Sequence, residues 1–145
     1  MALWLFYGLI SFVIVGKAMF SAQGAMYLVN SFVFTLCALT MAFLISSIFN
    51  NKEAVNGIVN VVALGSAFLC GAFIPVEWLP DGVLAVGRIF PAYWYIQTNE
   101  YLKTLETVSV SGLKPVFLNM LVMAGYGVFY IIVANIVSAK KRVVA

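Results

Sequence analysis

Few side chains in this sequence could carry out acid-base or nucleophilic chemistry. The 145 residues include no histidine, which excludes imidazole as a general acid or base and as a metal ligand. The Asp and Glu residues all lie outside the long apolar runs, so no intramembrane carboxylate could act with a serine or a metal. The phosphate-binding pattern G-x-x-x-x-G-K-S/T is also absent. We therefore predict that the chain is not an enzyme and uses no metal or cofactor.

The two cysteines add little further chemistry. Cys37 and Cys70 both lie inside apolar runs, and nothing in their spacing indicates that their side chains meet. Free cysteine packs as a small apolar residue. We therefore interpret both as buried packing residues rather than as a disulfide.

Ionisable groups that could couple transport to a proton or sodium gradient are equally scarce. Such carriers usually place charged side chains near the bilayer midplane, and here only Lys17 comes near it. Glu77 and Asp81 lie in a proline-rich segment, where they are either functional groups or ordinary solvated charges. A gradient-coupled carrier is therefore disfavoured.

The overall composition explains why charge is scarce. Hydrophobic residues make up 64% of the chain, charged residues make up 9%, and the mean hydropathy is +1.07. A water-soluble fold of this size cannot bury so much apolar surface. The Lys and Arg residues are scattered, apart from the run 140–142, so they form no stripe for nucleic acid. We expect the chain to lie in a membrane, with lipid headgroups as partners of its basic residues.

Four stretches are long and apolar enough to cross a hydrocarbon core of about 30 Å. They run from about 2 to 20, 25 to 49, 54 to 74 and 116 to 139, and Lys17 interrupts the first. We predict an all-α membrane protein whose residues 1–145 form a single transmembrane domain. Positively charged flanks stay in the cytoplasm, so the basic tail predicts two cytoplasmic termini, an inner turn at 50–53 and an outer segment at 75–115.

Small residues recur at four-residue spacing in two of these spans. In lipid, helices associate where small residues let their backbones approach closely. The two stripes are Ala38, Ala42 and Ser46 in the second span, and Ala63, Ala67 and Gly71 in the third. The stripes are either a moving transport surface or ordinary packing faces, and such faces occur in every class of helical membrane protein.

Four asparagines should face protein or water and hydrogen-bond across helices: Asn30, Asn60, Asn119 and Asn135.

Three prolines divide the segment between the third and fourth spans. Pro75, Pro80 and Pro91 each remove a backbone donor and disfavour helix at the preceding residue. The ten residues between the last two correspond to about 15 Å of helix, which is half of the membrane. This stretch cannot cross, so it either dips into the membrane and returns or lies at the interface. Aromatic residues follow, at 93–95 and 101, and predict a short interfacial helix and then a polar outer loop over 104–112.

The proline segment carries a resemblance. Its motif Gly71-x-Phe73-x-Pro75-x-x-x-Leu79-Pro80, followed by Pro91-x-Tyr93, resembles the C-terminal half of the type-2 ABC transporter permeases. The order of elements is similar as well: two spans, a tight inner turn, a span, a broken re-entrant outer hairpin, a last span and a basic tail. The resemblance covers essentially the whole chain and identifies its spans with the family's third to sixth.

The resemblance implies a function. The family's members are permeases that pair with a second permease half and two cytoplasmic ATPase subunits, and export a drug, lipid, peptide or glycan. By this resemblance, Pro75, Glu77, Pro80, Pro91 and Tyr93 would shape an outer gate, and the small-residue stripes would form a packing or pathway surface. The family's two further spans and its cytoplasmic coupling helix would precede Met1, so we expect a fragment of a longer permease in a bacterial plasma membrane. The alternative is a non-transporting membrane anchor or assembly subunit.

Overall fold

Long apolar runs with few helix breakers fold here into helices. The structure is a computed structural model that describes residues 2–16, 20–105 and 112–144. Within these ranges every regular element is a helix, and no strand is present. The α-helices are α1 (Ala2–Val15), α2 (Ala22–Ile48), α3 (Lys52–Leu69), α4 (Asp81–Gly87), α5 (Pro91–Thr104) and α6 (Lys114–Val144), and η2 (Val76–Trp78) is a short 3-10 helix.

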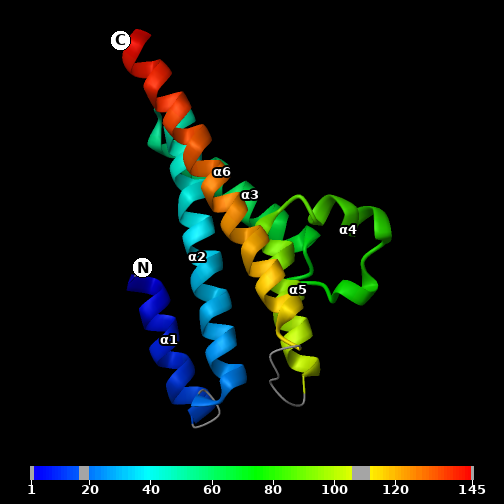
Figure 1. Ribbon diagram of the computed structural model, residues 1–145. Coiled ribbons are helices and arrows are strands. Elements are labelled where there is room, and N and C mark those ends of the chain that lie inside the picture. Colours follow the sequence, from blue (N-terminus) through cyan, green and yellow to red (C-terminus); the bar gives the residue numbers. More distant parts are fainter. Residues whose placement is uncertain (1, 17–19, 106–111, 145) are drawn as a thin grey trace.

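The centre of the fold is a bundle of α2, α5 and α6. Figure 1 shows α2 and α6 lying side by side and running in the same direction, with α5 packed against both. A buried apolar cluster holds α5 against the first half of α6. Its members are Leu102 at the end of α5 and Leu113, Val116, Met120 and Met123 from the start of α6.

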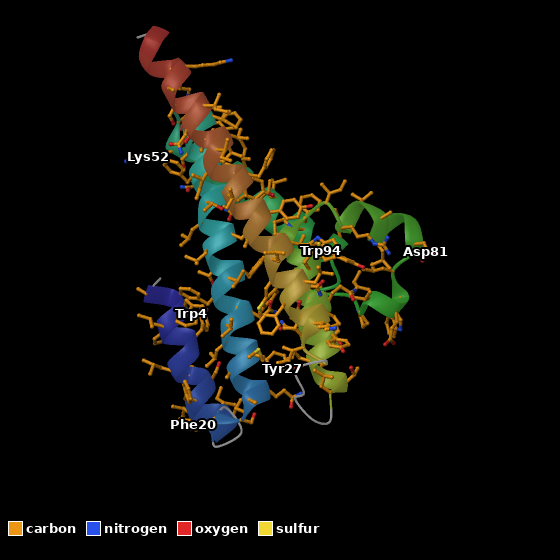
Figure 2. All side chains as sticks on the ribbon, in the orientation of Figure 1. Trp4, Phe20, Tyr27, Lys52, Asp81 and Trp94 are labelled. Atoms are coloured by element: carbon orange, nitrogen blue, oxygen red, sulfur yellow. The ribbon has the colours of Figure 1, made fainter. Side chains whose placement is uncertain are left out.

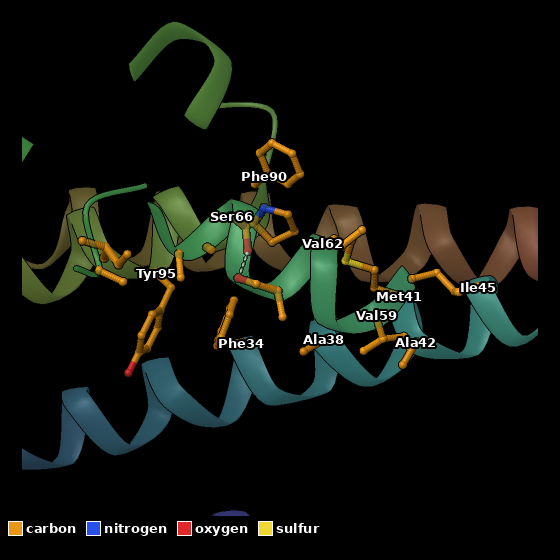
Figure 3. Close-up of a pocket in the computed structure, with 16 residues that line it drawn as sticks. Phe34, Ala38, Met41, Ala42, Ile45, Val59, Val62, Ser66, Phe90 and Tyr95 are labelled. Carbon is orange, nitrogen blue, oxygen red and sulfur yellow. Dashed lines mark hydrogen bonds between the residues drawn. The ribbon is translucent and has the colours of Figure 1, made fainter. Parts of the chain in front are cut away.

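Helices α3 and α5 divide the length of α2 between them. Both run opposite to α2, α3 along its C-terminal half and α5 along its N-terminal half (Figures 1 and 3). The 18 residues of α3 span about 27 Å and the 14 residues of α5 about 21 Å, so the two together match the length of α6. The chain leaves the bundle between them and forms η2 and α4 at the side (Figure 1).

The end of α3 corrects the sequence-based expectation of a span over 54–74. The helix stops at Leu69, and Gly71 adopts a left-handed φ of 92°. The amide of Ala72 donates to the Ala67 carbonyl at 3.0 Å, which is the closing hydrogen bond of a Schellman motif. Glycine carries little penalty in this conformation. The residue that the sequence pattern placed on a packing face therefore terminates the helix instead.

Two helices have the length and hydropathy of a membrane span among the described residues. They are Ala22–Ile48 and Lys114–Lys141. The first helix, α1, is 14 residues long rather than the expected span over 2–20, because Gly16 adopts a left-handed φ of 62° just after Val15. Lys17, which interrupts that expected span, lies outside the described residues.

Indole contacts fix α1 against α2. The Trp4 Nε1 donates to the Ser31 Oγ at 2.9 Å, and its ring meets Phe32 edge-on with centroids 5.1 Å apart. Figure 2 shows Trp4 between the two helices. Because Ser31 is ten residues past the N-cap Ser21, α1 lies along the lower half of α2.

Large apolar side chains cover the outside of the bundle. Val13 is 84% exposed, Val61 is 72% exposed and Leu121 is 70% exposed. These positions lie on three different helices. A surface of this kind is suited to contact with lipid tails.

The proline segment forms short pieces, as its spacing predicts. Pro80 is the N-cap of the seven-residue helix α4, and Pro91 occupies the first turn of α5, where its missing donor costs nothing. At about 10 Å, α4 is too short to cross a membrane. Asp81 lies at the far edge of this excursion, away from the bundle (Figure 2).

Candidate functional site

An apolar cavity of about 380 Å³ lies where α3 ends and α5 begins. Its walls come from α2, α3 and the first turns of α5 (Figure 3). The lining includes Phe34, Met41 and Ile45 from α2, Val59 and Val62 from α3, and Phe90, Tyr95 and Ile96 from the start of α5. Its volume falls in the range of roughly 300–1,000 Å³ that is typical of ligand sites.

The small-residue stripes contribute to this cavity from opposite walls. Ala38 and Ala42 of α2 and Ala63 and Ala67 of α3 all line it. Because alanine side chains are short, the two helices leave open space here instead of filling it with longer side chains. That the stripes form a surface for helix packing or for a transport pathway stays a prediction.

The last members of both stripes lie elsewhere. Ser46 is exposed, and its hydroxyl donates to the Ala42 carbonyl of its own helix at 3.0 Å. Gly71 lies beyond the end of α3, where a Cβ would come within 2.5 Å of the Val76 side chain. Neither residue lines the apolar cavity.

An aromatic stack joins α2 to α5 beside the cavity. The rings of Phe34 and Tyr95 lie 4.6 Å apart between centroids with an interplanar angle of 18°. Both residues line the cavity, and Figure 3 shows them at the end that faces α5. Tyr95 was expected only as part of an aromatic belt, because a sequence does not show which distant ring it meets.

A second cavity of about 640 Å³ lies between the η2 loop and α5. It is more polar than the first, because Glu77, Gln97, Glu100 and Lys103 line it together with other residues of the loop and of α5. Lys103 forms an exposed ion pair with Glu100 one turn earlier. The hydrogen bond to the Glu100 carboxylate raises the pKa of the Lys103 ammonium.

The residues predicted to shape an outer gate are distributed between these features. Pro75 and Glu77 line the polar cavity, and Pro91 lines the apolar one. Pro80 caps α4 and lines neither. Tyr93 is buried in α5, with the Arg88 guanidinium 6.0 Å from its ring centroid. Their role in gating stays a prediction.

The excursion that contains α4 is fastened to the bundle at Gly87 and Arg88. A Cβ on Gly87 would lie 2.7 Å from the Leu69 carbonyl oxygen, so the two backbones approach closely. The Arg88 carbonyl accepts hydrogen bonds from Trp94 Nε1 at 3.1 Å and from the Tyr126 hydroxyl at 3.4 Å. The sequence alone does not predict this junction, because a single glycine within an apolar run carries no local signal of a close contact.

Both cysteines are buried and neither forms a disulfide. Cys37 is 2% exposed, and Cys70 is fully buried with its Sγ 3.6 Å from the Gly87 carbonyl. The interpretation of both as packing residues is therefore confirmed, and Cys70 also forms part of the α3 to α4 junction. No group of three or more Cys, Asp or Glu side chains in the described parts of the chain is placed to hold a metal ion.

A buried polar cluster fixes α5 to α2. The Asn30 Nδ2 is completely buried and donates to the Tyr95 carbonyl at 3.1 Å and to the Asn99 Oδ1 at 2.9 Å. The Tyr27 hydroxyl, one turn earlier on α2, donates to the Asn99 carbonyl at 3.3 Å. Asn30 thus bonds across helices as expected, whereas Asn60 and Asn135 are exposed on the outside of the bundle.

The opposite end of the bundle is fixed by the basic tail. The Lys141 Nζ donates to the Ile48 carbonyl at 2.9 Å and to the Asn50 Oδ1 at 2.8 Å. An ammonium at this position neutralises the partial negative charge of the α2 C-terminus. The tail and the turn between α2 and α3 therefore lie at the same end.

Comparison with known families shows a match over the N-terminal two thirds of the chain. The family model described as ABC-2 type transporter matches residues 1–99, which is more than half of the chain and includes Pro75, Pro80 and Pro91. No curated protein and no solved structure shows significant similarity to the chain. The membrane domains of this family are non-catalytic permease subunits that generally pair with ABC ATPase subunits. With its apolar helices and its match over residues 1–99, the chain belongs to the ABC-2 type transporter family and is a membrane protein.

Proposed function

We propose that this chain is the transmembrane permease component of an ATP-driven ABC exporter, with a drug, lipid, peptide or glycan as cargo. The observation that carries this proposal is the apolar cavity at the junction of α3 and α5. A wall that consists of a broken helix can change shape more easily than one continuous helix. ATP hydrolysis is then the task of separate cytoplasmic ATPase subunits.

Four crossings of the membrane, by α1, α2, α3 and α6, are the topology that we propose. Successive crossings should alternate in direction, and α2 and α6 run together while α3 opposes them (Figure 1). Lys141 and Asn50 would lie at the cytoplasmic end, because positive flanks stay inside. The polar cavity and the C-terminal end of α5 would then face outward.

Labelling of single cysteines tests this orientation. A membrane-impermeant maleimide added to intact cells should react with Glu77→Cys and should leave Asn51→Cys unlabelled until the cells are permeabilised. Both positions are exposed on the protein surface, so burial does not limit either reaction. The reverse pattern of labelling would overturn the proposed orientation.

The gate that we propose is the loop that precedes α5 and contains η2 and α4. Held by Asn30 and by the Phe34 to Tyr95 stack, α5 closes the outer end of the apolar cavity. Motion of α3 and of this loop away from α5 would join the cavity to the outside. Pro75, Pro80 and Pro91 would confine the change in shape to the loop, because they prevent a continuous helix.

A second permease half would complete the transport unit. Exposed apolar faces on α1, α3 and α6 are available for contact with it or with membrane lipids. A non-transporting anchor remains the alternative and would require neither an ATPase nor a cavity. The two proposals therefore differ in what purifies with the protein.

The decisive experiment combines co-purification with a transport assay on a variant in which a larger side chain fills the apolar cavity. The full-length gene product should co-purify with an ABC ATPase subunit, and inverted vesicles that contain the complex should accumulate cargo when ATP is added. Ala67→Leu, which projects into the cavity, should reduce this accumulation at least about tenfold, while Ala124→Leu on the exposed face of α6 should not change it. Mass spectrometry of the vesicle contents, with and without ATP, provides the readout.

Purification without an ATPase, together with ATP-independent vesicle contents, would support the anchor instead. Co-purification of Ala67→Leu with the ATPase at the wild-type ratio shows that a loss of accumulation does not come from misassembly.

A further inference from the structure

The apolar and the polar cavity adjoin. Ala72 lines both of them, directly after the turn that ends α3. The first cavity extends from this point between α2 and α3, and the second extends between the η2 loop and the far end of α5. A single elongated molecule could therefore occupy both, with a change of polarity at the position of Ala72.

The apolar part suits a hydrocarbon chain. Alanine, valine and aromatic side chains supply most of its wall, and the Ser66 hydroxyl that lines it already donates to the Ala63 carbonyl at 2.9 Å. A polar group placed here would lose its hydrogen bonds to water without replacement, which disfavours its binding. A flexible methylene chain has no such cost and adapts to a narrow space between helices.

The polar part suits a head group that contains an amine. Two carboxylates, Glu77 and Glu100, and one ammonium, Lys103, line it, which leaves an excess of negative charge. The aromatic ring of Tyr101 lies in the same wall and can also contact a cation. Because Glu100 already pairs with Lys103, the excess charge belongs to Glu77, and a head group that carries only negative charge would be repelled there.

We propose that the two cavities form one binding site for a single-chain amphiphile with an amine-containing head group. The chain occupies the space between α2, α3 and α5, and the head group lies against Glu77 and Glu100. This arrangement rests on the proposed function for its outward orientation, in which the head group faces the outer surface as it does in an outer leaflet. The site itself requires no ATP and no ATPase.

Photolabelling tests the site directly. The probe is a lysophosphatidylethanolamine that carries a diazirine in its acyl chain, added to the purified full-length protein in nanodiscs without ATP and without ATPase subunits. Label should appear in peptides that contain Phe34, Met41 or Val62. Ala72→Phe, which places a large ring between the two cavities, should lower this labelling at least about tenfold.

The matched control is Ala124→Phe, which adds the same ring at an exposed position of α6 outside both cavities. It should label as the wild type does. Equal labelling of Ala72→Phe and wild type, or label confined to exposed surfaces such as Leu121, would overturn the proposal. Unchanged melting temperatures of the two variants show that the fold is intact, so a loss of label reports on the site.

Head-group selectivity forms the second arm of the test. Lysophosphatidic acid with the same diazirine chain lacks the amine and should label the cavity about two- to fivefold less, the range expected for exposed ion pairs. Glu77→Gln should reduce this difference. Equal labelling by both probes would overturn the assignment of the head group. Because no step involves ATP, these outcomes are independent of the co-purification that tests export.

Discussion

The two sides of the bundle differ in how tightly they are packed. Helix α6 buries Val116, Met123 and Ala134 completely, and it contacts α2 along much of its length. Helix α3 has a similar apolar composition, yet it contains no buried residue and faces α2 across a cavity. Both helices have sequences suited to lipid, but only α6 packs closely against α2.

This difference separates a fixed part of the molecule from a movable one. In a membrane, helices gain stability from close van der Waals packing and hydrogen bonds, because lipid tails solvate apolar side chains as well as protein does. Helices α2, α5 and α6 have both kinds of contact, including the Asn30 cluster. Helix α3 makes few close packing contacts and few hydrogen bonds with the other helices, so a change in its position would cost little free energy. We infer that transport would move α3 and the α4 excursion relative to the other three helices.

The largest expected effect comes from removing a buried side chain of α6. Met123→Ala should lower the free energy of unfolding by about 2 kcal/mol, the lower end of the range for such cavities, because lipid rather than water solvates the unfolded helix. The matched change on α3 is Leu64→Ala, where the side chain is 55% exposed. It should cost less than about 0.5 kcal/mol. Unfolding in mixed micelles with increasing denaturing detergent measures both.

If Met123→Ala and Leu64→Ala lowered the free energy of unfolding by similar amounts, α3 would be packed as firmly as α6. The contrast between the two helices would then be wrong. A lower free energy of unfolding in Met123→Ala alone would support the difference in packing between α6 and α3. Cargo accumulation by Leu64→Ala should remain at the wild-type level, because Leu64 does not line the cavity.

The ends of the long spans were predictable, because their signals are local. The second and fourth expected spans differ from α2 and α6 by at most five residues at either end, because polar or charged residues flank both apolar runs, although α6 continues through the basic tail. The separation of α4 from the preceding loop and from α5 was also predictable, because Pro80 and Pro91 interrupt the helix there. The interpretation of Cys37 and Cys70 depended only on their apolar surroundings and is confirmed.

The cavity was not predictable, because it depends on contacts between residues far apart in sequence. Gly71 fits a four-residue spacing with Ala63 and Ala67, and only the backbone conformation shows that it ends the helix. The position of α5 depends on pairs such as Phe34 with Tyr95, whose rings are 61 positions apart in the sequence. A pattern of small residues gives the same signal whether two helices touch or enclose a space.

A smaller and more local effect is expected at the junction of α3 and α4. Gly87→Ala places a Cβ about 2.7 Å from the Leu69 carbonyl oxygen, so the excursion must shift away from the end of α3, at a cost of about 1–2 kcal/mol. Gly82→Ala is the matched control on the same helix, because a Cβ there meets nothing within 4 Å. Hydrogen exchange followed by mass spectrometry should show faster exchange over residues 70–90 in Gly87→Ala alone, with unchanged protection in α2 and α6. Faster exchange throughout α6 would show instead that the excursion and the fixed helices unfold as one unit, which would contradict the division between a movable and a fixed part.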